Sequence, residues 1–230
     1  MKKFLITLFC LFIAATVNAE TIFVESNVNV DNYWQKSTWL EVKLVDKVGR
    51  RLIHANNLKR APIFVERNRK IVNAYASTYN KRVVIYMGTL AYINNDDELA
   101  FILGHELAHA QEYYDGFCKL IAMKFNNKKY EYKADLKAID YMVKAGYNPI
   151  AAIIISNKIF DEPLWDWGFL SLHPTGSKRL IKMYEYIYKK YPSYLTSSMT
   201  NSPAYLDFLK NYEKELSSFR QRQARKNNNL

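Results

Sequence analysis

The feature that most restricts the fold of this chain is the pentapeptide HELAH at residues 105–109, which lies within a segment of helical character. On a helix, His105 and His109 lie one turn apart on the same face, so their imidazoles can bind one zinc ion together. Glu106 can then reach a water molecule beside the metal and act as a general base. The alternative is a buried histidine pair with a structural role. A zinc site also needs a third ligand, which the fold must bring from elsewhere in the chain.

Two carboxylates further along the chain are suited to complete such a site. Glu131 and Asp135 are four residues apart and therefore share one face of the next expected helix. We expect Glu131 to be the third ligand and Asp135 to accept a hydrogen bond from a ligating imidazole. The alternative for Asp135 is a surface salt bridge with Lys133 or Lys137. The combined pattern predicts one zinc ion per chain, although related ligand sets also bind other divalent ions.

Capping residues delimit the two helices that carry these side chains. Asn95 followed by Glu98 resembles a capping box and predicts a helix from Asn95 toward Tyr114. A second helix is expected over residues 130–145, because Gly146 follows it as a C-terminal stop signal.

The rest of the chain predicts an α+β fold that is mostly helical. Helical spacing of apolar residues over 33–58 predicts a first helix, and runs of β-forming residues predict a small sheet with strands at 62–66, 71–76 and 82–87. Further helices are expected from Pro149, over 178–190 and over 205–219, with a loop at 191–203 and a tail that frays from Arg225. The apolar stripe of the last helix favours docking on the body of the protein over binding a partner.

The N-terminal residues have the pattern of a secretory signal. A basic start at Lys2 and Lys3 precedes an apolar stretch over 4–15 and small residues up to Ala19. The alternative, an uncleaved anchor, is disfavoured because this stretch is shorter than the roughly 20 apolar residues that span a bilayer. We therefore expect a signal peptide at 1–19, a metallopeptidase domain at 20–203, a C-terminal amphipathic helix with a basic tail at 204–230, and an exported, periplasmic protein that is soluble after cleavage.

Charge and cysteine content indicate which partners and which covalent cross-links to expect. The formal net charge is +11, but the basic residues are scattered, which favours a solvated basic surface over a polyanion site. No nucleic-acid partner is expected for an exported chain, whereas weak contact of the basic tail with an anionic membrane surface stays open. Cys118 is the only cysteine after residue 19, so no intramolecular disulfide is expected.

Several motifs, taken in order, resemble one known family. The sequence is similar to the gluzincin metallopeptidases that include the heat-shock protease HtpX and the CAAX prenyl proteases. The resemblance covers roughly residues 62–188 and rests on these segments: Asn73–Ala76, Asp97–Ala100, His105–His109, Glu131–Asp135, Ala145–Pro149, and His173-Pro174 with Arg179. It implies a zincin-like metallopeptidase domain in which Glu131 binds zinc and Asp135 supports a ligand.

The resemblance also assigns roles that spacing alone does not. It places His173 near the metal, either as a donor that stabilises the oxyanion or as a fourth ligand that blocks the metal until substrate displaces it. Arg179 is expected to orient the loop that carries His173. The segment that matches the family's edge strand would bind an extended substrate through its main chain, the alternative being a covered internal strand. That segment consists of Asn73, Ala74, Tyr75 and Ala76.

The function implied is that of a zinc metalloendopeptidase acting on unfolded or misassembled envelope proteins. By architecture the chain resembles small periplasmic members of the family and the protease domain of the β-barrel assembly-enhancing protease. The alternative is a metal-stabilised scaffold or chaperone-like protein that is gated or inactive. Glu106 argues against that alternative, because a scaffold has no need for a general base beside the metal.

Overall fold

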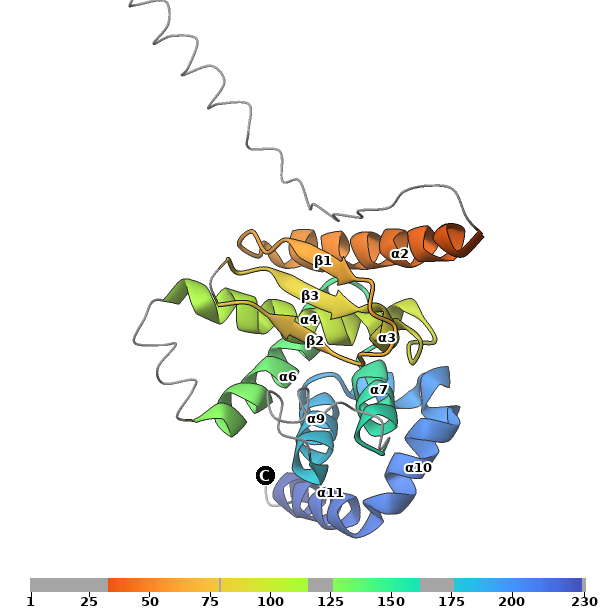
Figure 1. The fold of residues 1–230 in the computed structure, drawn as a ribbon. Coiled ribbons are helices and arrows are strands. Elements are labelled where there is room, and N and C mark those ends of the chain that lie inside the picture. The colour runs from red at the N-terminus through yellow and green to blue at the C-terminus, as the bar shows by residue number, and fades with distance from the viewer. Residues whose placement is uncertain (1–32, 79, 116–125, 162–175, 229–230) are drawn as a thin grey trace, which may run out of the picture.

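The computed structural model describes residues 33–78, 80–115, 126–161 and 176–228 (Figure 1). The predicted signal peptide, Cys118 and His173 lie outside these residues. Within the described ranges, no helix combines the length and apolar character needed to cross a bilayer. The α+β, mostly helical fold class is confirmed, with one small three-stranded sheet among the described residues.

The sheet contains the three predicted strands, each shorter than expected, in the order β1-β3-β2. Strand β3 is central, parallel to β1 and antiparallel to β2. It ends where the short helix α3 begins, which explains why the predicted third strand was too long. The bounds are β1 Ile63–Glu66, β2 Ala74–Ala76, β3 Val83–Tyr86 and α3 Met87–Leu90.

Helix α4, Asp96–Glu112, is the central element of the fold and carries the HELAH motif. Every residue from Glu98 to Ala110 is buried, because α4 packs against α2 (Tyr33–Asn56), the sheet, and the helices that follow it. In Figure 1, α2 runs beside β1, while the helices from α6 onward lie on the side of β2. The metal motif is therefore held inside the protein, between the sheet and the C-terminal helices.

The N-terminus of α4 is capped nearly as predicted. The Asn95 side chain accepts a hydrogen bond from the main-chain N–H of Glu98 (2.9 Å). The Glu98 carboxylate, however, accepts from the N–H of Asn94 (2.9 Å) and not from that of Asn95, and it also binds Lys158 Nζ at 2.8 Å. The buried Glu98 thus ties the start of α4 to α7, Ile150–Asp161.

Helix α6, Asn127–Lys144, crosses α4 at close range and begins three residues earlier than predicted. The two helices lie close together at Gly104, where a Cβ atom would lie 3.4 Å from both Cα and Cβ of Ala138. A glycine within a helix costs roughly 1 kcal/mol relative to alanine, so the close approach accounts for its presence here. The chain then leaves α6 through Gly146, whose φ of 76° is the left-handed conformation expected of a helix stop.

We predict that Gly104→Val destabilises the protein by about 1–3 kcal/mol, because the branched side chain would force α6 away from α4. The same displacement would separate Glu131 from the histidines and weaken metal binding. The free energy of unfolding from urea titration measures the first effect. Gly104→Ala is the matched control and should be close to neutral, because its Cβ makes a tight but tolerable contact and gains helix propensity. Equal stabilities of the valine and alanine variants would contradict this account.

The C-terminal part corrects two sequence-based predictions. The expected loop at 191–203 contains two short 3-10 helices, and the expected single last helix is two helices separated at Tyr212. The break lets Phe208 and Phe219 pack on Tyr184, with ring centroids 6.0 and 6.3 Å away. The tail expected to fray from Arg225 is helical to Asn228. The bounds are α9 Ser177–Lys190, η2 Pro192–Thr196, η3 Ser198–Asn201, α10 Pro203–Asn211 and α11 Glu213–Asn228.

The expectation that the apolar stripe docks on the body of the protein is confirmed. Tyr205, Phe208, Leu216 and Phe219 are buried and belong to the same hydrophobic core cluster as α4. The helices α10 and α11 therefore contribute to the core that holds the metal motif.

Candidate metal centre

Two helices bring three potential ligands together. The Nε2 atoms of His105 and His109 on α4 are 3.1 Å apart. The Glu131 carboxylate on α6 lies opposite them, with Oε2 3.3 Å from His105 Nε2 and Oε1 3.1 Å from His109 Nε2. All three side chains are buried, and one ligand atom from each can be chosen such that all lie within 4.8 Å of one another.

This arrangement fits a zinc ion. Tetrahedral zinc with bonds of about 2.0–2.1 Å places neighbouring ligand atoms roughly 3.3 Å apart, close to the separations between these side chains. Two imidazoles and one carboxylate are also the ligand set of catalytic zinc sites that keep one position open. Buried carboxylate oxygens and ring nitrogens that face one another need a cation or protons between them, and a divalent ion meets that need.

Asp135 and Arg179 contact the potential ligands without belonging to the ligand cluster. His105 Nδ1 lies 3.0 Å from Asp135 Oδ1, as predicted for a residue that fixes the orientation of a ligating imidazole. Arg179 on α9 donates two hydrogen bonds to Asp135, from Nε at 2.8 Å and from Nη2 at 2.6 Å, and its Nη1 lies 3.2 Å from Glu131 Oε2. The alternative considered for Asp135 does not occur, because Lys133 and Lys137 both pair with Glu112.

In this cluster, neighbouring charges and hydrogen bonds oppose the effect of burial on the pKa values. Burial would raise the pKa of Asp135, which is 1% exposed, but the Arg179 guanidinium and His105 hold it at about 2. Burial likewise lowers the pKa of His109. For His105 burial acts in the same direction, but hydrogen bonds to Asp135 and Glu131 outweigh it and raise the pKa to about 10. The carboxylates of Asp135 and Glu131 thus create a negative potential at His105 that favours a proton or a metal cation there.

Glu106 occupies the position expected of a general base. It is 2% exposed and follows His105 on α4 without being one of the three clustered ligands. A small cavity is lined by Glu106 and His105 together with Phe101, Ile102, Ser156, Ile159 and Arg179. The carboxylate therefore borders a space beside the first histidine, where a reacting group could be held.

The predicted substrate strand lies at an edge of the sheet, since β2 pairs only with β3 among the described strands. The carbonyl of Asn73 accepts hydrogen bonds from the Tyr86 N–H (3.0 Å) and from Thr89 Oγ1 (2.7 Å). Main-chain groups alternate in direction along an antiparallel strand, so Asn73 and Tyr75 face β3, while Ala74 and Ala76 face outward. Of the four residues predicted to bind substrate, only the two alanines present main-chain groups to the open edge.

Tyr113 is a neighbour of the site that the sequence reasoning missed. Its hydroxyl donates a hydrogen bond to the carbonyl of Ala76 (3.3 Å), linking the end of α4 to the edge strand. Burial, together with the charges of Glu106 and Glu131, raises its pKa. Tyr113 follows His109 by four residues, and this spacing is the one signal that could have pointed to it.

Comparisons with known proteins agree with this geometry. Residues 40–115 match peptidase family M48, and the matched part includes the whole HELAH motif. This part of the chain is thus similar to the M48 peptidases. The chain is also 28% identical, over 142 residues, to the mitochondrial metalloendopeptidase OMA1 of Arabidopsis thaliana. That alignment covers 49% of this chain and 29% of the relative, so the chain spans under a third of the relative's length.

The M48 match confirms the gluzincin resemblance at the level of the family, whereas the closer likeness to HtpX or to the β-barrel assembly-enhancing protease stays a prediction. Because the match ends at residue 115, the placement of Glu131, Asp135 and Arg179 rests on the geometry alone. His173 lies outside the described residues, and its role also stays a prediction.

Proposed function

We propose that this chain is a zinc-dependent metalloendopeptidase. The observation that carries the proposal is the convergence of His105, His109 and Glu131 on one point, with the buried Glu106 beside them and an M48 match over the motif. A bound zinc ion would polarise the scissile carbonyl and make water a stronger nucleophile at neutral pH. A purely structural metal site would have no use for the additional buried carboxylate.

The residues of the chain have distinct tasks in this reaction. Glu106 accepts a proton from the attacking water and passes it to the nitrogen of the leaving amine, so its carboxylate begins and ends the cycle ionised. Asp135 holds His105 in orientation, and Arg179 holds both Asp135 and Glu131. His173 is proposed to stabilise the oxyanion or to gate the metal.

The proposed substrates are unfolded or misassembled proteins of the cell envelope. The outward main-chain groups of Ala74 and the outward N–H of Ala76 can pair with an extended segment, while the Ala76 carbonyl already accepts a hydrogen bond from Tyr113. Such pairing depends little on the side chains of the substrate. Folded proteins rarely present such segments, whereas unfolded ones do. Export through the signal-like residues 1–19 would place the enzyme among envelope proteins, and its basic tail would favour weak contact with anionic membrane surfaces.

The experiment that tests this proposal is cleavage of a permanently unfolded model protein by the purified chain, with zinc quantified. We expect one zinc ion per chain and cleavage that a chelator stops and added zinc restores. His109→Ala should lose more zinc affinity than the roughly 10- to 100-fold expected for loss of a residue that only supports a ligand, and should lose cleavage, because it removes one of three ligands. His54→Ala is the matched control, since this histidine is exposed on α2, and it should keep both properties. A chain that binds zinc yet cuts nothing would favour the scaffold alternative.

A further inference from the structure

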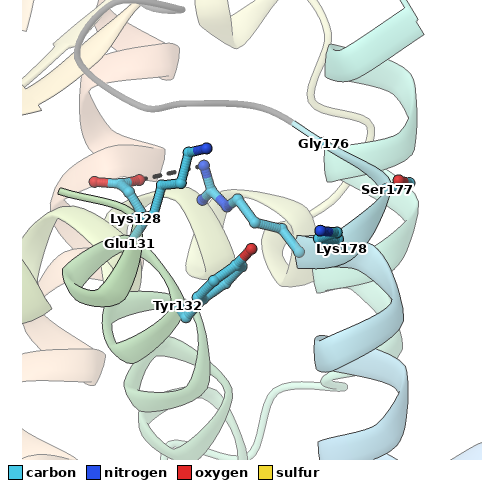
Figure 2. A pocket seen from close by; sticks show the side chains of 7 residues that line it. Lys128, Glu131, Tyr132, Gly176, Ser177 and Lys178 are labelled. Carbon is cyan, nitrogen blue, oxygen red and sulfur yellow. Dashed lines mark ion pairs between the residues drawn. The ribbon is translucent and has the colours of Figure 1, made fainter. Parts of the chain in front are cut away.

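A cavity of about 330 Å³ opens directly beside the metal centre, between α6 and the start of α9. Figure 2 shows Lys128 and Tyr132 on α6, with Ser177 and Lys178 across from them on α9. Glu131 also lines this cavity, so one residue is shared between the cavity and the metal-ligand cluster. A group bound here would therefore lie close to a peptide bond held at the metal.

The lining of this cavity is strongly cationic. Among the described residues that line it, three side chains are positive, those of Lys128, Lys178 and Arg179, and one is a carboxylate, that of Glu131. Arg179 is already engaged with Asp135 and Glu131. Lys128 and Lys178 are both exposed, and neither forms an ion pair with another described residue. Their charges are therefore available to a ligand.

Two neighbouring features add to the positive potential. Lys182 places its ammonium group 4.1 Å from the centroid of the Tyr132 ring, which brings a further cation next to the cavity wall. The cavity also faces the first turn of α9, where free N–H groups favour negative charge and where Gly176, at the N-cap, has no side chain to accept them. The Tyr132 ring supplies an apolar surface against which the methylene stem of an acidic side chain can pack.

We propose that this cavity is a substrate subsite that binds a carboxylate close to the scissile bond, so that the enzyme prefers acidic substrate segments. The inference rests on the proposed function. The carboxylate has two sources, an Asp or Glu side chain within the substrate or the C-terminal carboxylate of the substrate. Lys128 and Lys178 are the residues that determine this specificity, because they supply charge that the metal-ligand cluster does not use.

The test compares peptides that differ only at one position next to the cleaved bond. That position is Glu, Gln or Lys, and each peptide is made with a free and with an amidated C-terminus. Their dissociation constants are measured on zinc-loaded Glu106→Gln protein, and kcat/KM is measured on the wild type. We expect the Glu peptide to exceed the Gln peptide by about tenfold in affinity and in kcat/KM, and the Lys peptide to be the weakest. The preference should shrink as salt is raised, because the lysines are exposed.

In the double variant Lys128→Gln, Lys178→Gln, the Glu and Gln peptides should have nearly equal affinities and nearly equal kcat/KM values. The double variant Lys144→Gln, Lys210→Gln removes two exposed lysines that do not line the cavity and should keep the ratio. A preference that depends on the free C-terminus, and not on the Glu side chain, identifies the C-terminal carboxylate as the ligand. Equal binding of all peptides would overturn the subsite while leaving hydrolysis intact, whereas selective binding without hydrolysis would overturn the proposed function alone.

Discussion

Replacing Glu106 with glutamine is expected to abolish hydrolysis of an unfolded protein while one zinc ion per chain stays bound. Glutamine has nearly the same shape as glutamate but cannot accept the proton that the reaction must remove from water. General-base catalysis contributes roughly 10²- to 10⁴-fold, so the rate should fall by at least that factor. Zinc should stay because the converging ligand atoms belong to His105, His109 and Glu131. Product formation and metal content, measured on the same sample, provide both readouts.

The matched control is Glu112→Gln, which changes another buried glutamate of α4. Glu112 pairs with Lys133 at 2.7 Å and Lys137 at 2.5 Å and is not part of the metal-ligand cluster. This variant should lose some stability but keep its activity per zinc-loaded molecule. Turnover by Glu106→Gln close to the wild-type rate would place the base elsewhere, and loss of zinc from this variant would make Glu106 a ligand.

The site helices could be predicted from the sequence because their signals are local. Asn95 and Gly146 act through the hydrogen bonds and dihedral angles of their own turns, so the start of α4 and the end of α6 were found within about one residue. The break at Tyr212 was missed because the apolar spacing from Tyr205 to Phe219 is continuous. The break comes from tertiary packing of Phe208 and Phe219 on Tyr184, which spacing does not encode.

The cluster of proposed metal ligands could be predicted from the sequence to the extent that helical periodicity allows. Spacing could predict that His105 and His109 share a face, and that Glu131 and Asp135 share another. It could not predict that Gly104 lets these two faces meet. Arg179 illustrates the same limit: spacing did not predict that it binds Asp135 and Glu131 from a helix more than 40 residues away, and its expected role toward the His173 loop stays a prediction.

Replacing Arg179 with leucine is expected to lower the free energy of unfolding of the zinc-free protein by about 3–5 kcal/mol. The guanidinium is buried and is the partner of two carboxylates that are 1% and 2% exposed, those of Asp135 and Glu131. Leucine would leave these two buried negative charges with the imidazolium of His105 as their remaining neighbouring cation, so one negative charge would be uncompensated. The pKa of Asp135 would then rise from about 2, because burial, which raises it, would no longer be opposed by Arg179. Urea titration with the metal chelated measures the change.

Two further variants separate the charge of Arg179 from its shape and size. Arg179→Lys should recover only part of the loss, since a single ammonium group cannot reproduce the two parallel hydrogen bonds to Asp135. The double variant Arg179→Leu, Asp135→Leu should be more stable than Arg179→Leu alone, because it removes one of the two buried carboxylates along with the cation. If the single and double variants were equally unstable, lost packing and not uncompensated charge would be the cause. Arg179 would then support α9 and not the metal ligands.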